Sequence, residues 1–346
     1  MCPLSEADRT MRGGPVSVVA APPATRRPEW TRQLTNPVVA VYAALVLVLI
    51  VGSVLVGLRG GVLLDQGGIM NILTRSTALG LVAIGQTMVI LTGKLDLSVA
   101  YVVGLCSLIA AETMAGNDSM VLPAVLLTLA CAAGVGLVNG LVVTKLKVNA
   151  FIATLGMGLV IRGYLEHNYE GPAGDVPRVF QHLGYDRIGP VPIAALLMVG
   201  LAVLAWWFLG RTRPGYHVYA VGGDEEVARF SGIRNDRTVI MVHVLCAVAA
   251  GLAGLFLASR LGSGAPWVGT DGGYDLESIA AVVLGGTILA GGRGGVAGTI
   301  GGVFILATLD TVFDDLGMNS FFKDVVRGAV LIVAVALYAR RRRAAR

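Results

Sequence analysis

The stretch "VVAVYAALVLVLIVGSVLVGL", residues 38–58, carries no charged side chain, and its only side-chain hydroxyls belong to Tyr42 and Ser53. A helix rises about 1.5 Å per residue, so this stretch spans about 31 Å, close to the thickness of the hydrocarbon core of a bilayer. It therefore predicts a helix that crosses a membrane. The rest of the chain has the same character, because 55% of its 346 residues are hydrophobic and only 14% are charged.

Further apolar runs follow this one, and none of the long runs alternates polar and apolar residues as a β-barrel strand does. We therefore expect an all-α integral membrane protein with about ten transmembrane helices. The candidate spans are 38–58, 69–91, 97–115, 121–143, 150–166, 191–210, 239–259, 276–291, 296–313 and 321–339. The segment 276–291 starts among acidic residues and ends in glycine-rich turns, so it either crosses the membrane or forms a partial, re-entrant helix.

Basic residues predict the topology, since Lys and Arg gather on the cytoplasmic side of membrane proteins. With ten spans and both termini in the cytoplasm, most of them face inward, including Lys94, Lys145, Lys147 and the arginines of 211–237. We expect a disordered cytoplasmic tail at 1–36, a transmembrane domain at 37–340 and a basic cytoplasmic tail at 341–346. Topology explains the net charge of +5, so we expect the lipid bilayer, and no nucleic acid, as a partner.

Small residues recur at every fourth position in two places, which lets a neighbouring helix approach closely. One stripe contains Gly136 and Gly140, and the other contains Gly294, Gly298 and Gly302. Packing within the chain is the main interpretation. A subunit interface or a wall of the transport pathway is the alternative.

The stretch "GGDEEVARFSGI", residues 222–233, is a compact acidic run in an otherwise basic chain, between two predicted spans. Its residues predict a short capped helix. Asp224 suits the N-cap, and the two glutamates after it place negative charge on the first turn, where the helix dipole favours it. Gly232 suits the C-terminal stop.

The same helix carries charges beside an apolar ridge. Glu225 and Arg229 have the spacing of an i to i+4 ion pair, while Val227 and Phe230 share one flank. Such a ridge fits a groove on another protein. A helix that rests on lipid headgroups is the alternative, although such helices are usually longer and richer in Lys and Arg.

Four long stretches then occur in order: "ILTGKLDLSV" (90–99), "VNGLVVTKLKVNAFIATLGMGLVIRG" (138–163), "RTRPGYHVYAVGGDEEVARFSGI" (211–233) and "DLESIAAVVLGGTILAGGRGGVAGTIGG" (275–302). Together they resemble the membrane permease subunits of bacterial ABC importers for monosaccharides, the ribose and xylose type, over about residues 70–340. Three positions depart from that family's usual pattern. Lys94 and Ala100 stand where the family usually has Gly, and Asp224 stands where it commonly has Asn.

The resemblance implies a type II-like importer bundle with a cytoplasmic coupling helix that docks onto a separate ATPase subunit. It also implies alternating access by two permease subunits, identical or different, in the bacterial plasma membrane. It further implies an extracytoplasmic sugar-binding protein that delivers the ligand, and ATPases that use ATP and Mg. The residues implied in ATPase coupling are Gly222, Gly223, Asp224, Glu225, Glu226, Ala228, Arg229, Phe230 and Gly232.

The sequence agrees with the expectation that ATP is hydrolysed by a separate subunit. It contains no G-x-x-x-x-G-K-[ST] phosphate loop and no nucleophile–base or metal-binding spacing, so we expect a transport subunit that is not an enzyme and binds no cofactor or metal. An ABC permease for a nucleoside, a branched-chain amino acid or a sugar-derived signal is the nearest alternative. An ion-coupled secondary carrier is a more distant one.

An uncharged sugar needs hydroxyl, amide and aromatic groups along a wet pathway. The candidate pathway residues are Asp96, Ser98, Asn139, Thr154, Glu277 and Ser278. Helix capping is an equally good interpretation of the first two. The ionisable residues within or at the ends of predicted spans are assigned to anchoring or loop contacts, with a proton relay as the alternative: Glu112, Glu166, His243, Glu277 and Asp310. Three tryptophans at predicted membrane interfaces are assigned no binding role: Trp206, Trp207 and Trp267.

Overall fold

The computed structural model describes residues 37–319, 323, 325, 326, 328 and 329. The expected tails at 1–36 and 341–346, and most of the expected span at 321–339, lie outside these described residues. Secondary structure in the described part is almost entirely helical, with one two-residue hairpin formed by β1 (Arg187–Ile188) and β2 (Val191–Pro192).

Six helices among the described residues are long and apolar enough to cross a membrane. They are α2 (Pro37–Gly57), α3 (Gln66–Leu91), α5 (Val121–Lys145), α8 (Ile193–Arg211), α11 (Asn235–Leu261) and α14 (Val296–Asp315). The expected helical membrane architecture is therefore confirmed. The expected spans at 97–115 and 150–166 correspond to α4 (Val99–Met114) and α6 (Ala150–Asn168). The shorter elements are η1 (Asp118–Met120), α7 (Arg178–Tyr185), α9 (Arg213–Gly223), α10 (Glu225–Phe230), α12 (Val268–Asp271) and α13 (Tyr274–Leu284).

The expected span at 276–291 is wrong as a continuous helix, because α13 ends at Leu284. Its 11 residues extend only about 16 Å, roughly half of the hydrocarbon thickness. The helix ends there because Gly286 takes a left-handed conformation with φ of 85°. The Thr287 N–H then donates to the carbonyl of Val282 at 3.2 Å, which closes the last turn as in a Schellman cap.

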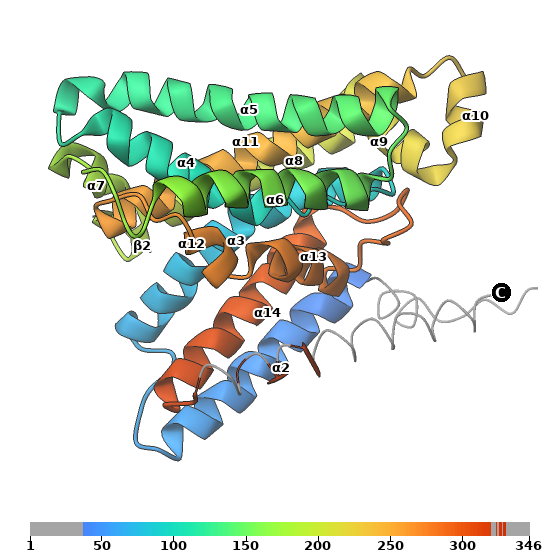
Figure 1. Cartoon of the computed structure of the whole chain (residues 1–346). Coiled ribbons are helices and arrows are strands. Elements are labelled where there is room, and N and C mark those ends of the chain that lie inside the picture. Colours follow the sequence, from blue (N-terminus) through green and yellow to red (C-terminus); the bar gives the residue numbers. More distant parts are fainter. Residues whose placement is uncertain (1–36, 320–322, 324, 327, 330–346) are drawn as a thin grey trace, which may run out of the picture.

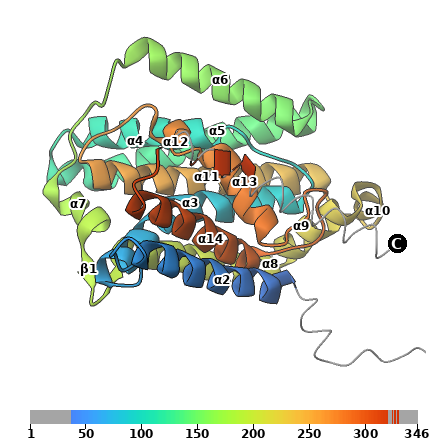
Figure 2. The same ribbon diagram turned by 90° about the horizontal axis from the view of Figure 1, so that it is seen from below.

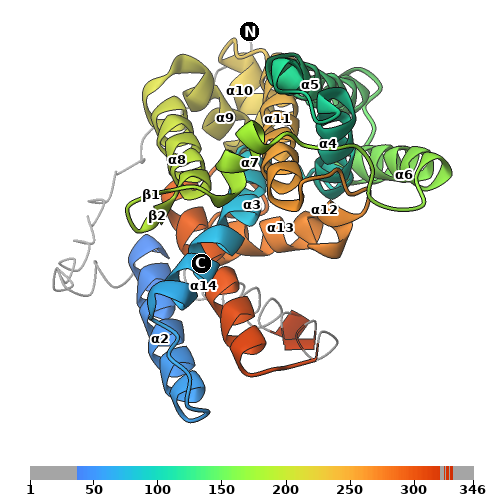
Figure 3. The ribbon, with the colours of Figure 1, turned by 90° about the vertical axis from the view of Figure 1, so that its left-hand side faces the viewer.

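Helix α11 lies in the centre of the bundle and packs against α3, α4 and α5. Figure 1 shows α5, α6 and α11 with their axes roughly aligned, and α2 and α14 side by side in a separate, inclined pair. Seen from below, α6 lies at the outer edge of the molecule (Figure 2), where it contacts α4 and α5. A third view shows α8 and α6 on opposite sides of the α11 region (Figure 3).

Glycines permit the closest helix contacts. A Cβ on Gly136 would lie 2.7 Å from Val244 Cα, and one on Gly140 would lie 2.7 Å from Ile240 Cα, so both residues sit where α5 meets α11. Gly298 and Gly302 approach even more closely, because a Cβ on them would overlap the carbonyl oxygens of Gly285 and Ala281 at the end of α13. Gly294 is different, because it precedes the start of α14 at Val296 and has φ of 136°. The interpretation of Gly294 as part of a helical stripe is therefore wrong.

Candidate functional site

The acidic run at 222–233 starts with the last two residues of α9 and then forms α10, a separate short helix. Asp224 is its N-cap, and its Oδ1 accepts hydrogen bonds from the backbone N–H groups of Glu226 (2.9 Å) and Val227 (3.0 Å). Two of the backbone donors left open at a helix start are satisfied in this way. Gly232 ends the turn in a left-handed conformation with φ of 82°, which glycine adopts without strain.

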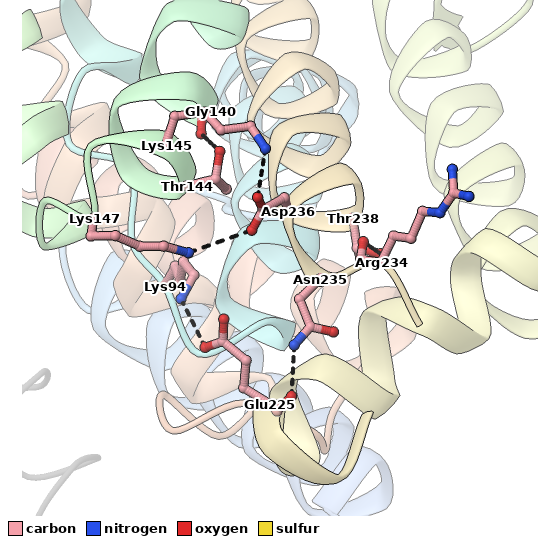
Figure 4. Close-up of polar contacts among 10 residues, drawn as sticks. All are labelled: Lys94, Gly140, Thr144, Lys145, Lys147, Glu225, Arg234, Asn235, Asp236 and Thr238. Atoms are coloured by element: carbon pink, nitrogen blue, oxygen red, sulfur yellow. Dashed lines mark hydrogen bonds and ion pairs between the residues drawn. The ribbon is translucent and has the colours of Figure 1, made fainter. Parts of the chain in front are cut away.

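The side chain of Glu225 does not pair with Arg229, contrary to the i to i+4 expectation. It reaches Lys94 Nζ at 3.6 Å, on the loop between α3 and α4, while Arg229 lies 3.9 Å from Glu226. A second tie comes from Asn235, whose Nδ2 donates to the Glu225 carbonyl at 2.6 Å. Two separate elements, the loop after α3 and the start of α11, therefore hold α10 in place (Figure 4).

Beside this contact, Asp236 at the start of α11 bridges two lysines. Its Oδ2 accepts from Lys145 Nζ at 2.7 Å, and its Oδ1 lies 3.6 Å from Lys147 Nζ (Figure 4). The lysines belong to the end of α5 and to the turn that leads into α6, so Asp236 fastens that turn to α11. These charged residues line an open cavity of about 660 Å³ together with Glu226 and Arg229 of α10.

The outward flank of α10 is apolar. Val227 and Phe230 are 60% and 78% exposed, and the Arg229 guanidinium lies over the Phe230 ring at 5.4 Å from its centroid. Ala228 is the buried residue of this helix and packs with Val143, Ala150 and Val239. One face of α10 is thus anchored in the bundle, and the flank that carries Val227 and Phe230 is mostly exposed.

The two glycines before the cap have different surroundings. A Cβ on Gly222 would overlap the Leu91 carbonyl oxygen at the end of α3 and lie 2.6 Å from the Gly292 nitrogen. These two backbone groups are hydrogen-bonded to each other at 2.9 Å. A Cβ on Gly223 would meet nothing within 4 Å. Nearby, Tyr219 of α9 donates its hydroxyl to the Gly294 carbonyl at 3.1 Å, and burial raises the pKa of this phenol.

Four of the six candidate pathway residues meet in one buried polar network. Asp96 Oδ1 accepts from the Ser98 backbone N–H (3.0 Å) and hydroxyl (2.6 Å), and Asn139 Nδ2 donates to Ser98 Oγ at 2.9 Å. Thr154 Oγ1 accepts from the Leu97 N–H at 3.0 Å and donates to the Ala150 carbonyl at 2.8 Å. All four polar side chains are at most 1% exposed. The network joins the start of α4 to α5 and α6, and a pathway role for it stays a prediction.

The other two candidates lie apart, in α13. Ser278 is buried and donates to the Asp275 carbonyl at 3.2 Å, while Glu277 is half-buried one residue earlier. His243 is fully buried in α11, with Nδ1 2.9 Å from the Val239 carbonyl. Among the described residues, no group of three or more His, Cys, Asp or Glu is arranged to hold a metal ion.

Comparison with known proteins gives the family. Residues 68–335 match the family model described as "Branched-chain amino acid transport system / permease component". The chain belongs to this permease family. It is 39% identical over 272 residues to the ribose import permease protein of Escherichia coli K12, covering 77% of this chain and 84% of the relative.

Other relatives have related names. The ribose import permease protein of Bacillus subtilis strain 168 is 40% identical over 279 residues, or 79% of this chain and 85% of the relative. The L-arabinose transport system permease protein of Escherichia coli K12 is 36% identical over 263 residues, or 74% and 77%. No solved structure matches the chain significantly. The chain is therefore a multi-pass membrane permease, a transport subunit.

The sequence did not predict the ion pairs that fasten α10 and the α5–α6 turn to the rest of the bundle. The sequence assigns Lys94, Lys145 and Lys147 to the cytoplasmic side and shows Lys94 as a departure from the family pattern, but it predicts no partner for them and does not single out Asp236. Their partners are distant in sequence, so no local spacing reveals them. The one available signal is that acidic residues at helix starts lie on the same predicted side of the membrane as the lysines.

Proposed function

We propose that this chain is the membrane-spanning subunit of an ATP-driven importer that moves a monosaccharide into the cytoplasm. The observation that carries the proposal is the arrangement of α10. This six-residue helix is capped, tied to the loop after α3 and to the start of α11, and presents exposed Val227 and Phe230 outward. A small rigid helix of this kind suits the groove of a second protein.

The sugar class rests on the names of the relatives. Ribose and arabinose appear in the names of proteins 36–40% identical to this chain, and galactose appears in the name of the galactose/methyl galactoside import permease of Escherichia coli K12, which is 32% identical. The description of the family model mentions branched-chain amino acids, which makes L-leucine the appropriate competing substrate in any test.

The mechanism is alternating access. Two permease subunits enclose the pathway, and two cytoplasmic ATPase subunits that use ATP and Mg open and close it through α10. A sugar-binding protein delivers ligand from the opposite side of the bacterial plasma membrane. In this arrangement the chain has ten spans and both termini lie in the cytoplasm, with Asp224 to Gly232 as the coupling element.

The proposal is tested in proteoliposomes that contain the chain, its ATPase and its sugar-binding protein, with radiolabelled D-ribose and L-leucine as substrates. We expect ATP-dependent uptake of ribose and none of leucine. Glu226→Ala and Arg229→Ala change α10 without touching its cap, so we expect them to separate ATP hydrolysis from uptake. Arg211→Ala removes an exposed charge from the end of α8 and serves as the matched control.

Two outcomes contradict the proposal. The first is ribose uptake driven by an ion gradient in liposomes that contain the chain alone. The second is normal uptake and normal substrate-stimulated hydrolysis in both α10 variants. Uptake of leucine in place of ribose would keep the ATP-driven mechanism and replace the substrate class.

A further inference from the structure

A second cavity, of about 270 Å³, lies between α4, α6 and α12. Its walls include two aromatic side chains, Tyr101 of α4 and Trp267 at the start of α12. Polar side chains come from α6 and α12. They are Arg162, Glu166, Thr270 and Asp271.

This cavity is on the half of α6 that lies far from the coupling helix. Arg162 is about 18 Å along the helix from Ala150, which packs beside α10. Figure 1 likewise shows α10 at the opposite end of the molecule from the end of α6 that leads to α7. In the proposed topology, the cavity is in the half of the protein that faces the sugar-binding protein.

The walls of the cavity are rigid. The Tyr101 ring lies against α6 at Gly158, where a Cβ would be 2.6 Å from the ring carbon Cδ2. On the other side, a Cβ on Gly269 of α12 would overlap the Ala100 carbonyl of α4. The segment before Trp267 is held to α4 by Ser107, whose Oγ is 3.1 Å from both the nitrogen and the oxygen of Ala265. The aromatic side chains are therefore presented by closely packed backbone.

The polar side chains of the cavity include one guanidinium and two carboxylates, so they offer both hydrogen-bond donors and acceptors. Arg162 Nε donates to Glu166 Oε1 at 2.7 Å, and the Tyr101 hydroxyl also interacts with the guanidinium. The remaining guanidinium N–H groups and the second carboxylate oxygen are available to a ligand. Asp271 adds an exposed carboxylate. Two carboxylates beside one guanidinium disfavour an anionic ligand, and three charged side chains disfavour an acyl chain.

This combination fits an uncharged polyol. Aromatic faces cover the C–H face of a sugar ring, while the guanidinium and the carboxylates donate to and accept from its hydroxyls. The volume is slightly below the usual range of about 300–1,000 Å³ for small-molecule pockets, which suits a ligand of one sugar ring. We propose that Tyr101, Trp267, Arg162, Glu166 and Asp271 form a monosaccharide subsite in the outer half of the pathway, an inference that rests on the proposed function.

The experiment uses the full chain in lipid nanodiscs with Trp30, Trp206 and Trp207 replaced by Phe, so that Trp267 is the only indole. D-ribose is titrated while Trp267 emission is recorded. A matched chain that keeps only Trp206, an exposed residue of α8, reports non-specific effects. We expect a saturable change from Trp267, no change from Trp206, and no response of either to L-leucine.

Substitutions then test the polar groups. Asp271→Asn and Glu166→Gln each remove a charged acceptor, and we expect each to weaken ribose binding about tenfold. Trp267→Tyr retains an aromatic face, so we expect it to preserve ribose uptake in the assembled importer better than Trp267→Leu. Circular dichroism of every variant checks that the helices remain folded.

The outcomes separate this inference from the proposed function. If the chain that keeps only Trp267 imports ribose with its ATPase and binding protein, but its emission does not respond to ribose, the subsite is overturned and the importer stands. An equal response to leucine also overturns it, as does unchanged ribose affinity in both carboxylate variants. If the uptake assay shows that the assembled importer moves no sugar, the proposed function is overturned.

Discussion

Gly222→Ala should destabilise the end of the bundle that holds α10. The new methyl group would overlap the Leu91 carbonyl oxygen and lie 2.6 Å from the Gly292 nitrogen, so the chain must move apart there. Overpacking of this kind costs about 1–3 kcal/mol. Separation also stretches the hydrogen bond from the Gly292 N–H to the Leu91 carbonyl. Such a bond contributes about 0.5–1.5 kcal/mol to the stability. We expect a total loss of about 2–4 kcal/mol in the free energy of unfolding.

The adjacent glycine provides the control. Gly223→Ala places the same methyl group where nothing lies within 4 Å, and Ala restricts the unfolded chain more than Gly does. We expect its stability to match or exceed that of the unchanged chain by up to about 1 kcal/mol. Reversible unfolding of the three proteins in SDS–detergent mixtures, followed by circular dichroism, measures the difference. Equal stability of the two variants would refute the steric reasoning, because only their surroundings differ.

Three further outcomes are expected. Asn139→Ala removes the donor to Ser98 inside the bundle and should lower the free energy of unfolding by about 1–3 kcal/mol in the same SDS assay. A loss below about 0.5 kcal/mol would contradict the assigned hydrogen bond. Glu225→Gln breaks the pair with Lys94, which is partly exposed, so stability should fall by less than about 1 kcal/mol, and by less again in high salt. Phe230→Ala should leave stability unchanged but weaken co-purification of the permease with its ATPase; retained binding would show that the exposed ring is not part of the interface.

The helices were predictable because each signal is local. A run such as 38–58 needs only its own composition to predict α2, and Asp224 needs only the three residues after it to act as an N-cap. Segment 276–291 was harder, because its apolar run continues past Leu284 while Gly286 ends the helix. Gly tolerates both a helical and a left-handed conformation, so the sequence does not decide between them.

Long-range partners were not predictable. The Glu225 side chain had a suitable partner four residues away in Arg229, yet it pairs with Lys94 because the loop after α3 passes beside α10. The same limit applies to the second cavity. Tyr101, Arg162 and Trp267 are more than 60 residues apart in sequence, and their proximity follows from the packing of Gly158 and Gly269. A membrane-interface role was therefore the natural interpretation of Trp267 from the sequence alone.

The arrangement connects α10 to the second cavity through a short series of contacts. Glu225 pairs with Lys94, and the loop that carries Lys94 continues directly into the buried network, where the Leu97 N–H donates to Thr154 on α6. Arg162 lies about two turns farther along the same helix, in the cavity wall. A displacement of α10 that pulled on Lys94 would act on α6, which lies at the outer edge of the molecule and contacts α4 and α5. Contiguity alone does not establish coupling between two sites. The contacts do identify α6 as the shared element, because both a movement of α10 and a ligand in the cavity would change its position.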